Sequence, residues 1–438
     1  MRLLRLALKN TRIVGEKPLD INFSTSRNAV VLLGDNACGK STVLDSIAFM
    51  AGPLLERLLP GTAKDLTRTD VHYDREGRAA PYLEVMAWFE AGAAGTVYES
   101  RTIGLYGTVP DSHIEEIERL ADTAKEDNSL LPVFAYYGTG RGHIGTTAQK
   151  QNAHGFRRTD CYRDALDPSA GFGTFLAWYA AAEEQERAEA ARHNFPAAYR
   201  LPALQAVRKA LARFVGHRFH SPRTETHPPR FVMSEYGGIC MDRDMGIGQM
   251  SDGYKIMTAM VADIAARMAM ANPHMDDPLF SPGIILVDEI DLHLHPKWQR
   301  TVVAGLTDTF PNAQFIATTH SPVVVAGAAG TAQVVRLVCR DDSLCDDIEA
   351  EQDLETMDIG QILLSDLFGL PSLRPPMWDH LLARRDELLA SASLSEAENS
   401  ELERINAELS VLQTGNTPAE IRTARLLAEI AGKLGVRL

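Results

Sequence analysis

The chain has 438 residues, of which 45% are hydrophobic and 23% charged, and its formal net charge is −14. This length and composition are those of a globular protein that can bury a large core, either as one domain with insertions or as two to three smaller ones. The excess of acids excludes a protein that binds nucleic acid over its whole surface, but it allows a local basic patch.

The cysteines and the apolar segments indicate where the protein works. Its five cysteines include no C-x-x-C pair, which is typical of a reduced, cytoplasmic protein. Residues 1–9 carry a charge every few positions and lack the apolar core of a signal peptide. No run approaches 18 strongly apolar residues, so we expect no membrane span and no membrane partner.

The first part of the chain predicts strands around a glycine-rich turn. Residues 2–9 alternate apolar and basic side chains, as a strand with one buried face does. Residues 29–33 form a continuous apolar run that ends at Gly34, and a helix is predicted over 41–58. Shorter strands are expected at 21–23, 82–90 and 96–103.

The second part predicts more helix. Four aromatic residues lie on one face of a helix within 172–191, and we predict a helical insertion over 160–215. A long helix is expected at 254–271 and buried strands at 283–287 and 314–318. Capping boxes at Ser395/Glu398 and Thr417/Glu420 start later helices, in which the apolar stripe Leu402, Ile405, Leu409 and Leu412 is interpreted as core packing.

The segment from Gly34 to Ser41 matches the phosphate-binding motif G-x-x-x-x-G-K-[ST] in full, between a predicted buried strand and a helix. Backbone N–H groups of such a loop surround a phosphate, and the helix N-terminus attracts it. Lys40 is expected to bind the β- and γ-phosphates of ATP, and Ser41 to ligate Mg²⁺. The nucleotide-binding residues that we predict here are Gly34, Asn36, Ala37, Cys38, Gly39, Lys40, Ser41 and Thr42.

Two acids follow the apolar run 284–287. Asp288 is expected to hold Mg²⁺ through a water molecule, and Glu289 to act as the general base that orients the attacking water. An acidic pair after a strand can also be a simple helix cap, but the phosphate-binding motif favours catalysis.

His320 follows the predicted strand 314–318, where it can donate to the γ-phosphate. The sequence therefore predicts Glu289 and His320 as the catalytic residues.

Ser251 and Gly253 open the long helix before Asp288 and form a further predicted anion site, although an ordinary serine N-cap would look the same. The order of these motifs is that of ABC-type ATPases, in which the Ser-x-Gly helix covers the nucleotide of the opposite subunit. This resemblance implies homo-oligomers built from dimers that sandwich ATP between two copies.

Within that class the sequence resembles ATPases of bacterial anti-phage defence operons, of the Septu and retron-associated type, which are relatives of RecF, SMC and OLD proteins. The residues that carry the resemblance are 136–141, 250–254, 288–299 and 318–322. It implies a sensor or regulator that controls a separate effector nuclease, of the HNH type in Septu-like systems. No glutamine stands at the usual Q-loop place, which residues 136–141 occupy, and Asp252 replaces a glycine of the usual signature, so we expect slow hydrolysis.

The resulting prediction is an α/β fold, an ABC-type ATPase head with a mixed sheet. Its expected parts are 1–150 and 226–340, the two parts of the head, 151–225, a helical insertion, and 341–438, an acidic segment with a helical tail.

Residues 191–230 hold eight Arg or Lys against one acid, which suggests contact with nucleic acid. A pairing of these residues with the acidic segment 341–358 explains them equally well. The alternatives to the defence ATPase are a RecF/SMC-like ATPase that acts on DNA itself and an ATP-dependent scaffold without significant turnover. A metal site at Asp291, His293 and His295 is a weaker possibility, because no further ligands are evident.

Overall fold

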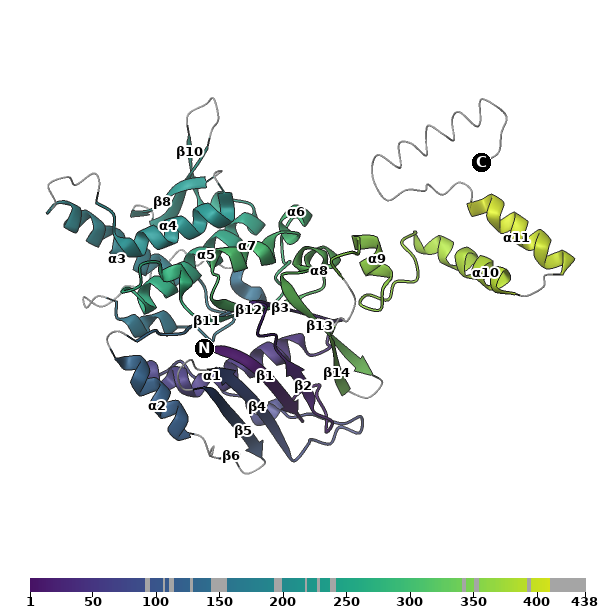
Figure 1. Ribbon diagram of the computed structural model, residues 1–438, viewed down its shortest axis with the longest axis horizontal. Helices are drawn as coiled ribbons and strands as arrows, with labels where there is room; N and C mark the ends of the chain where they lie inside the picture. Colours follow the sequence, from purple (N-terminus) through teal and green to yellow (C-terminus); the bar gives the residue numbers. More distant parts are fainter. Residues whose placement is uncertain are drawn as a thin grey trace. The chain divides into compact units, whose positions relative to one another are not determined.

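The computed structural model describes residues 1–90, 95–104, 107–109, 114–126, 129–142, 156–192, 199–216, 219–226, 229–236, 242–340, 344–349, 354–391 and 395–409. Contacts within the chain divide it into two units, Met1–Ile362 and Leu363–Leu438. The first unit contains three sheets, and the described part of the second unit contains helices joined by turns and loops (Figure 1).

The central sheet of the first unit has six strands in the order β14-β13-β3-β12-β11-β7. Neighbours pair in parallel, except β13 with β14, so the sheet is mixed as predicted. Every residue of β3, β7, β11 and β12 is buried, which explains the largely apolar sequences of these strands. The strands are β3 (Ala29–Leu33), β7 (Val133–Tyr137), β11 (Gly283–Val287), β12 (Ala313–Thr319), β13 (Ala332–Arg340) and β14 (Leu344–Glu349).

A second, antiparallel sheet has the order β2-β1-β4-β5-β6. Buried and less buried side chains alternate along β4, so one face of this sheet is covered. Helix α1 (Lys40–Leu58) contacts β12 on one side and β4 and β5 on the other, so it lies between the two sheets (Figure 1). The strands are β1 (Arg2–Lys9), β2 (Leu19–Asn22), β4 (Tyr82–Glu90), β5 (Thr96–Gly104) and β6 (Gly107–Val109).

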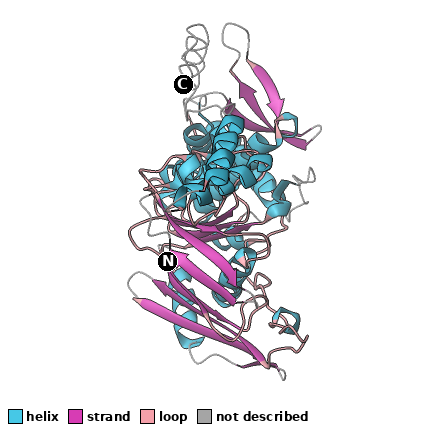
Figure 2. Ribbon diagram, turned by 90° about the vertical axis from the view of Figure 1, so that its right-hand side faces the viewer, coloured by secondary structure: helices cyan, strands magenta, loops and turns pink. Residues whose placement is uncertain are grey.

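Most of the remaining helices of the first unit gather beyond the central sheet, and a small sheet in the order β10-β9-β8 stands at their far side (Figure 2). The small sheet was not predicted. Among the described residues, no helix is long and apolar enough to cross a membrane. The elements are α2 (Ile114–Lys125), α3 (Gly173–Ala190), α4 (Pro202–Val215), α5 (Asp252–Ala271), α6 (Pro296–Gln299), α7 (Val302–Thr309), α8 (Pro322–Ala328), α9 (Ile359–Leu364), β8 (Phe219–Thr226), β9 (Pro229–Glu235) and β10 (Arg243–Gly246).

Helix α5 is the centre of this helical layer. Every residue from Ile256 to Ala271 is buried, and the helix packs against α3, α4 and β7. A buried polar group fixes it to β7: the hydroxyl of Tyr137 and the guanidinium of Arg267 both donate to Asp263, at 2.7 and 2.8 Å. The helix predicted over 254–271 is thus confirmed, two residues longer at its start. The predicted domain boundaries remain a proposal. The one between residues 225 and 226 falls inside β8.

The second unit contains α10 (Asp379–Ala390) and α11 (Glu396–Leu409). Leu388, Ile405 and Leu409 form its buried cluster, with Leu402 packed against it, so the predicted apolar stripe is confirmed up to Leu409. The capping box at Ser395 is confirmed by reciprocal hydrogen bonds with Glu398. The stripe residue Leu412 and the second capping box, Thr417/Glu420, lie outside the described residues.

Candidate functional site

The glycine-rich loop leaves the end of β3 and turns directly into α1. Gly39, the residue before the helix, has a φ of 93°, a left-handed conformation that glycine adopts without strain. The ammonium of Lys40 donates to the carbonyl oxygens of Gly34 and Asp35 at 2.8 and 2.9 Å, and only 7% of the residue is exposed. These bonds keep the charge over the loop, where a phosphate group can compete for it.

Ser41 and Asp288, the two predicted Mg²⁺ ligands, are in contact. The hydroxyl of Ser41 donates to Oδ2 of Asp288 at 2.9 Å, and the hydroxyl of Thr318 donates to its Oδ1 at 2.6 Å. They meet because β3, β12 and β11 are parallel neighbours whose carboxyl ends share one edge of the sheet. Hydroxyl and carboxylate oxygens are the ligands that Mg²⁺ prefers, so the residues present fit this ion.

Glu289 sits in a sharp turn directly after β11. Its φ is 48°, which is uncommon for a residue with a side chain. The N–H of Glu289 donates to the hydroxyl of Thr318 at 2.7 Å, and the N–H of Ile290 donates to the carbonyl oxygen of Thr318 at 2.9 Å. Thr318, the last residue but one of β12, therefore holds both the carboxylate that is predicted to bind Mg²⁺ and the turn that carries the predicted base.

Arg141 lies under this turn and is 1% exposed. Its guanidinium donates to the carbonyl oxygens of Gly138, Asp288 and Glu289. Burial lowers the pKa of Arg141 to about 10, against the opposing effect of the Asp288, Glu289 and Asp291 carboxylates, so the group stays charged at neutral pH. The sequence marked residues 136–141 as an unusual segment but did not reveal this contact.

One cavity of about 250 Å³ brings most of the predicted site residues together. It contains the acidic pair and the histidine together with the phosphate-binding loop, although these segments are far apart in the sequence. Ile13 was missed, because it lies in a turn that matches no motif. The lining residues are Ile13, Asn36, Ala37, Cys38, Gly39, Lys40, Ser41, Thr42, Asp288, Glu289 and His320.

Ser251 and Gly253 do not line this cavity. Ser251 is exposed at the start of α5, and its side chain makes no capping hydrogen bond. A Cβ at Gly253 would lie 2.6 Å from the carbonyl oxygen of His293. The ring centroids of Tyr254 and Trp298 are 4.7 Å apart. The start of α5 therefore packs on the loop that follows Glu289.

Both histidines of that loop, His293 and His295, make contacts within the chain. The carbonyl of His293 faces Gly253, and the ring of His295 accepts a hydrogen bond from the N–H of Lys297 at the start of α6. Within the described part of the chain, no group of three or more His, Cys, Asp or Glu side chains is arranged to hold a metal ion.

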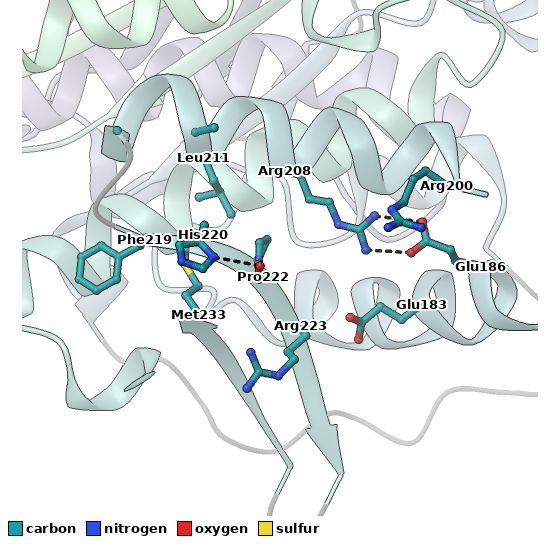
Figure 3. A pocket seen from close by; sticks show the side chains of 13 residues that line it. Glu183, Glu186, Arg200, Arg208, Leu211, Phe219, His220, Pro222, Arg223 and Met233 are labelled. Atoms are coloured by element: carbon teal, nitrogen blue, oxygen red, sulfur yellow. Dashed lines mark hydrogen bonds and ion pairs between the residues drawn. The ribbon is translucent and has the colours of Figure 1, made fainter. Parts of the chain in front are cut away.

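The basic stretch 191–230 borders a second cavity, of about 570 Å³, between α3, α4 and β8 (Figure 3). Arg208 forms two hydrogen bonds with Glu186, at 2.9 and 3.0 Å, and Lys209 pairs with Asp277. Burial raises the pKa of Glu186, but Arg208 and the N–H of Leu201 outweigh it and hold that pKa below its ordinary value.

These ion pairs bear on the sequence-based interpretation of the basic stretch, whose contact with nucleic acid stays a prediction. Three of its eight basic residues pair with acids that lie outside the counted window: Arg208 with Glu186, Lys209 with Asp277 and Arg223 with Asp244. The partners of Arg208 and Lys209 are also not in the acidic segment 341–358 that we considered. Arg218 lies outside the described residues.

Comparison with known proteins agrees with this geometry. A family model described as "AAA domain" matches residues 5–186, and another, "AAA domain, putative AbiEii toxin, Type IV TA system", matches residues 160–326. The chain is 28% identical to the Retron Ec83 probable ATPase of Escherichia coli, over 74% of this chain and 69% of that protein. It is 25% identical to the Retron Vc95 probable ATPase of Vibrio cholerae serotype O1 biovar El Tor, over 73% and 71%.

A shorter similarity and a solved structure complete the comparison. The Septu protein PtuA of Bacillus mycoides (strain KBAB4) is 32% identical over 161 residues, which are 37% of this chain and 22% of that protein. The crystal structure of an SMC head bound to the C-winged helix domain of ScpA superposes with a TM-score of 0.51 at 18% identity, over 80% of this chain and 97% of that one. This last likeness shows the fold, and it confirms the predicted α/β head.

Proposed function

We propose that this chain, an ABC-type P-loop protein related to the retron and Septu ATPases, binds ATP with Mg²⁺ and hydrolyses it slowly. The observation that supports this most strongly is the contact of Ser41 and Thr318 with Asp288, beside Glu289 and His320 in one cavity. The names of the relatives support the activity, and the cavity contains each group that the reaction needs.

Each residue of the cavity has a separate role in the proposed reaction. Ser41 and Asp288 would hold Mg²⁺, which would supply positive charge to stabilise the phosphate oxygens. Lys40 turns from the loop carbonyls to the β- and γ-phosphates. Glu289 orients a water molecule and accepts its proton while the water oxygen bonds to the γ-phosphorus and the bond to ADP breaks. His320 donates to the γ-phosphate.

Two copies of the chain close over two nucleotides in this proposal. Ser251 and the N-terminus of α5 are exposed, outside the cavity of their own subunit, and are therefore free to cover the ATP of a partner. Asp252 in place of a small signature residue supports slow turnover. We further propose that the closed dimer, in the cytoplasm, regulates a separate effector nuclease, of HNH type by analogy with Septu systems.

The two alternatives have less support. Direct action on DNA depended on the basic stretch, whose Arg208, Lys209 and Arg223 are paired with acids of the same chain. A scaffold without turnover would not need a carboxylate at Glu289 in the cavity beside the phosphate-binding loop.

A Glu289→Gln variant tests the proposal. We expect it to bind ATP but to hydrolyse it at least about 100-fold more slowly, since a positioned general base contributes that much. It should also form a dimer on addition of ATP and Mg²⁺, measured by light scattering. Glu84→Gln, on β4 of the antiparallel sheet, is the matched control and should behave like the wild type. Equal turnover of Glu289→Gln and the wild type would contradict the assigned base, and a protein that stays monomeric with ATP would contradict the sandwich.

A further inference from the structure

The turn that carries Glu289 is fixed at both of its peptide groups. The first peptide group joins Asp288 to Glu289: its carbonyl accepts from Arg141 and its N–H donates to the Thr318 hydroxyl. The second joins Glu289 to Ile290: its carbonyl accepts from Arg141 at 2.6 Å, and its N–H donates to the Thr318 carbonyl at 2.9 Å. Arg141 thus holds both carbonyl groups, and Thr318 holds both N–H groups.

These four contacts set the backbone angles of Glu289. A left-handed conformation is unfavourable for a residue with a side chain, and it persists only where the surroundings impose it. The two peptide planes on either side of the Glu289 Cα atom determine its φ and ψ, and therefore the direction of its side chain. The planes cannot rotate without breaking bonds to Arg141.

We propose that Arg141 is a positioning residue that holds the Glu289 carboxylate where it can act as the general base. This inference rests on the proposed function. Arg141 itself does not line the nucleotide cavity and is 1% exposed, so it acts through the backbone of Glu289. Its third bond, to the carbonyl of Gly138 at 2.9 Å, ties the same turn to the segment that follows β7.

Only an arginine can hold these carbonyl groups with one side chain. The guanidinium is a planar fork with several donors, and here it bonds to two successive carbonyl groups and to Gly138. A lysine ammonium at this place would keep the charge but not the fork. The variant Arg141→Lys therefore separates geometry from charge.

The test compares Arg141→Gln and Arg141→Lys with a matched arginine. Arg158 also donates to three backbone carbonyls, those of Ala271, Glu126 and Ser129, none of which belongs to the nucleotide site. We expect both Arg141 variants to lower kcat about 10- to 100-fold, the effect of a misplaced catalytic group. Their Kd for ATP, measured by calorimetry, should stay within a factor of about 3, because Arg141 does not line the cavity. Arg158→Gln should lower thermal stability but leave kcat within about twofold.

A double variant distinguishes positioning from general loss of structure. In the Glu289→Gln background no base remains to be positioned, so Arg141→Lys should cause no further loss of the residual rate. The proposal would be overturned if the rate losses of the two single variants multiplied in the double variant, or if Arg141→Lys kept the wild-type kcat. If Arg141→Gln does not fold, Arg141→Lys still decides the question. Wild-type turnover of Glu289→Gln by itself would instead contradict the proposed function, whatever the Arg141 variants do.

Discussion

Gly253 shows at the scale of one residue why the predicted signature position excludes larger side chains. A Cβ there would lie 2.6 Å from the carbonyl oxygen of His293, closer than such atoms approach in proteins. His293 has a φ of 61°, so its turn already has an unusual backbone. Any other residue at 253 would push the start of α5 away from the loop after Glu289. This close contact fixes the positions of the two segments relative to each other, and both belong to the proposed dimer face.

A Gly253→Ala variant should therefore be less stable than the wild type by about 1–3 kcal/mol, the usual cost of forcing extra atoms into a packed contact. The matched control is Gly248→Ala, because a Cβ at Gly248 would meet no atom of the described residues within 4 Å. Urea unfolding measures both. Equal stability of the two variants would mean that the α5 contact yields without cost.

At the scale of elements, α1 is anchored by the carboxylate of Asp45. This group pairs with Lys64 at 2.5 Å and Arg12 at 2.6 Å and accepts from the hydroxyl of Tyr136 at 3.1 Å. Burial raises the pKa of Asp45, but the two cations outweigh it and hold that pKa below its ordinary value. The contacts tie the helix behind the phosphate-binding loop to β7 and to the turn that contains Ile13.

Because the pKa of Asp45 is lower in the folded state than in the unfolded chain, its contribution is fully present above about pH 4 and is lost as the pH falls through the folded value. We expect Asp45→Asn to lower the free energy of unfolding by about 1–3 kcal/mol at pH 7. The difference from the wild type should shrink as the pH falls below about 4, because the carboxylate is then protonated first in the unfolded chain and, at lower pH, in the folded protein. Asp308→Asn, at an exposed position of α7, is the control. A difference that does not change with pH would contradict the ion-pair explanation.

At the scale of the whole molecule, our proposal is that a second copy of the chain completes the site. The lesions Lys40→Ala and Ser251→Arg would lie on opposite sides of the dimer interface. In a mixed dimer one composite site carries both lesions and the other carries neither. Lys40 and Glu289, in contrast, line the same cavity of one subunit.

Mixing the inactive variants Lys40→Ala and Ser251→Arg should therefore restore part of the ATPase activity, provided that one intact site can turn over. The control mixture of Lys40→Ala with Glu289→Gln should restore none, because each of its two sites keeps one lesion. Phosphate release measures both mixtures. A Ser251→Arg protein that stays monomeric and hydrolyses ATP at the wild-type rate would show that the site is complete within one chain.

Much of the central sheet could be predicted from the sequence, but not all of its strands. The apolar runs at β3 and β11 are continuous, the run at β12 covers Phe315–Ala317, and all three lead to residues with recognisable chemistry. β7 has a similar run, of which only Tyr136 and Tyr137 were noted, as part of the segment at the Q-loop place. β8 overlaps the end of the predicted insertion, and β9 and β10 lie beyond it. Their pairing depends on neighbours elsewhere in the chain, which local periodicity does not contain.

The sequence by itself determined the candidate chemistry of this protein, because the phosphate-binding loop and the acidic pair need particular side chains at adjacent positions of one segment. Only the tertiary structure decided which distant groups meet. Parallel alignment of β7 and β11 places Arg141 under Glu289, and α3 places Glu186 against Arg208. Such contacts join residues that are 148 and 22 positions apart, and they follow from strand order and helix packing.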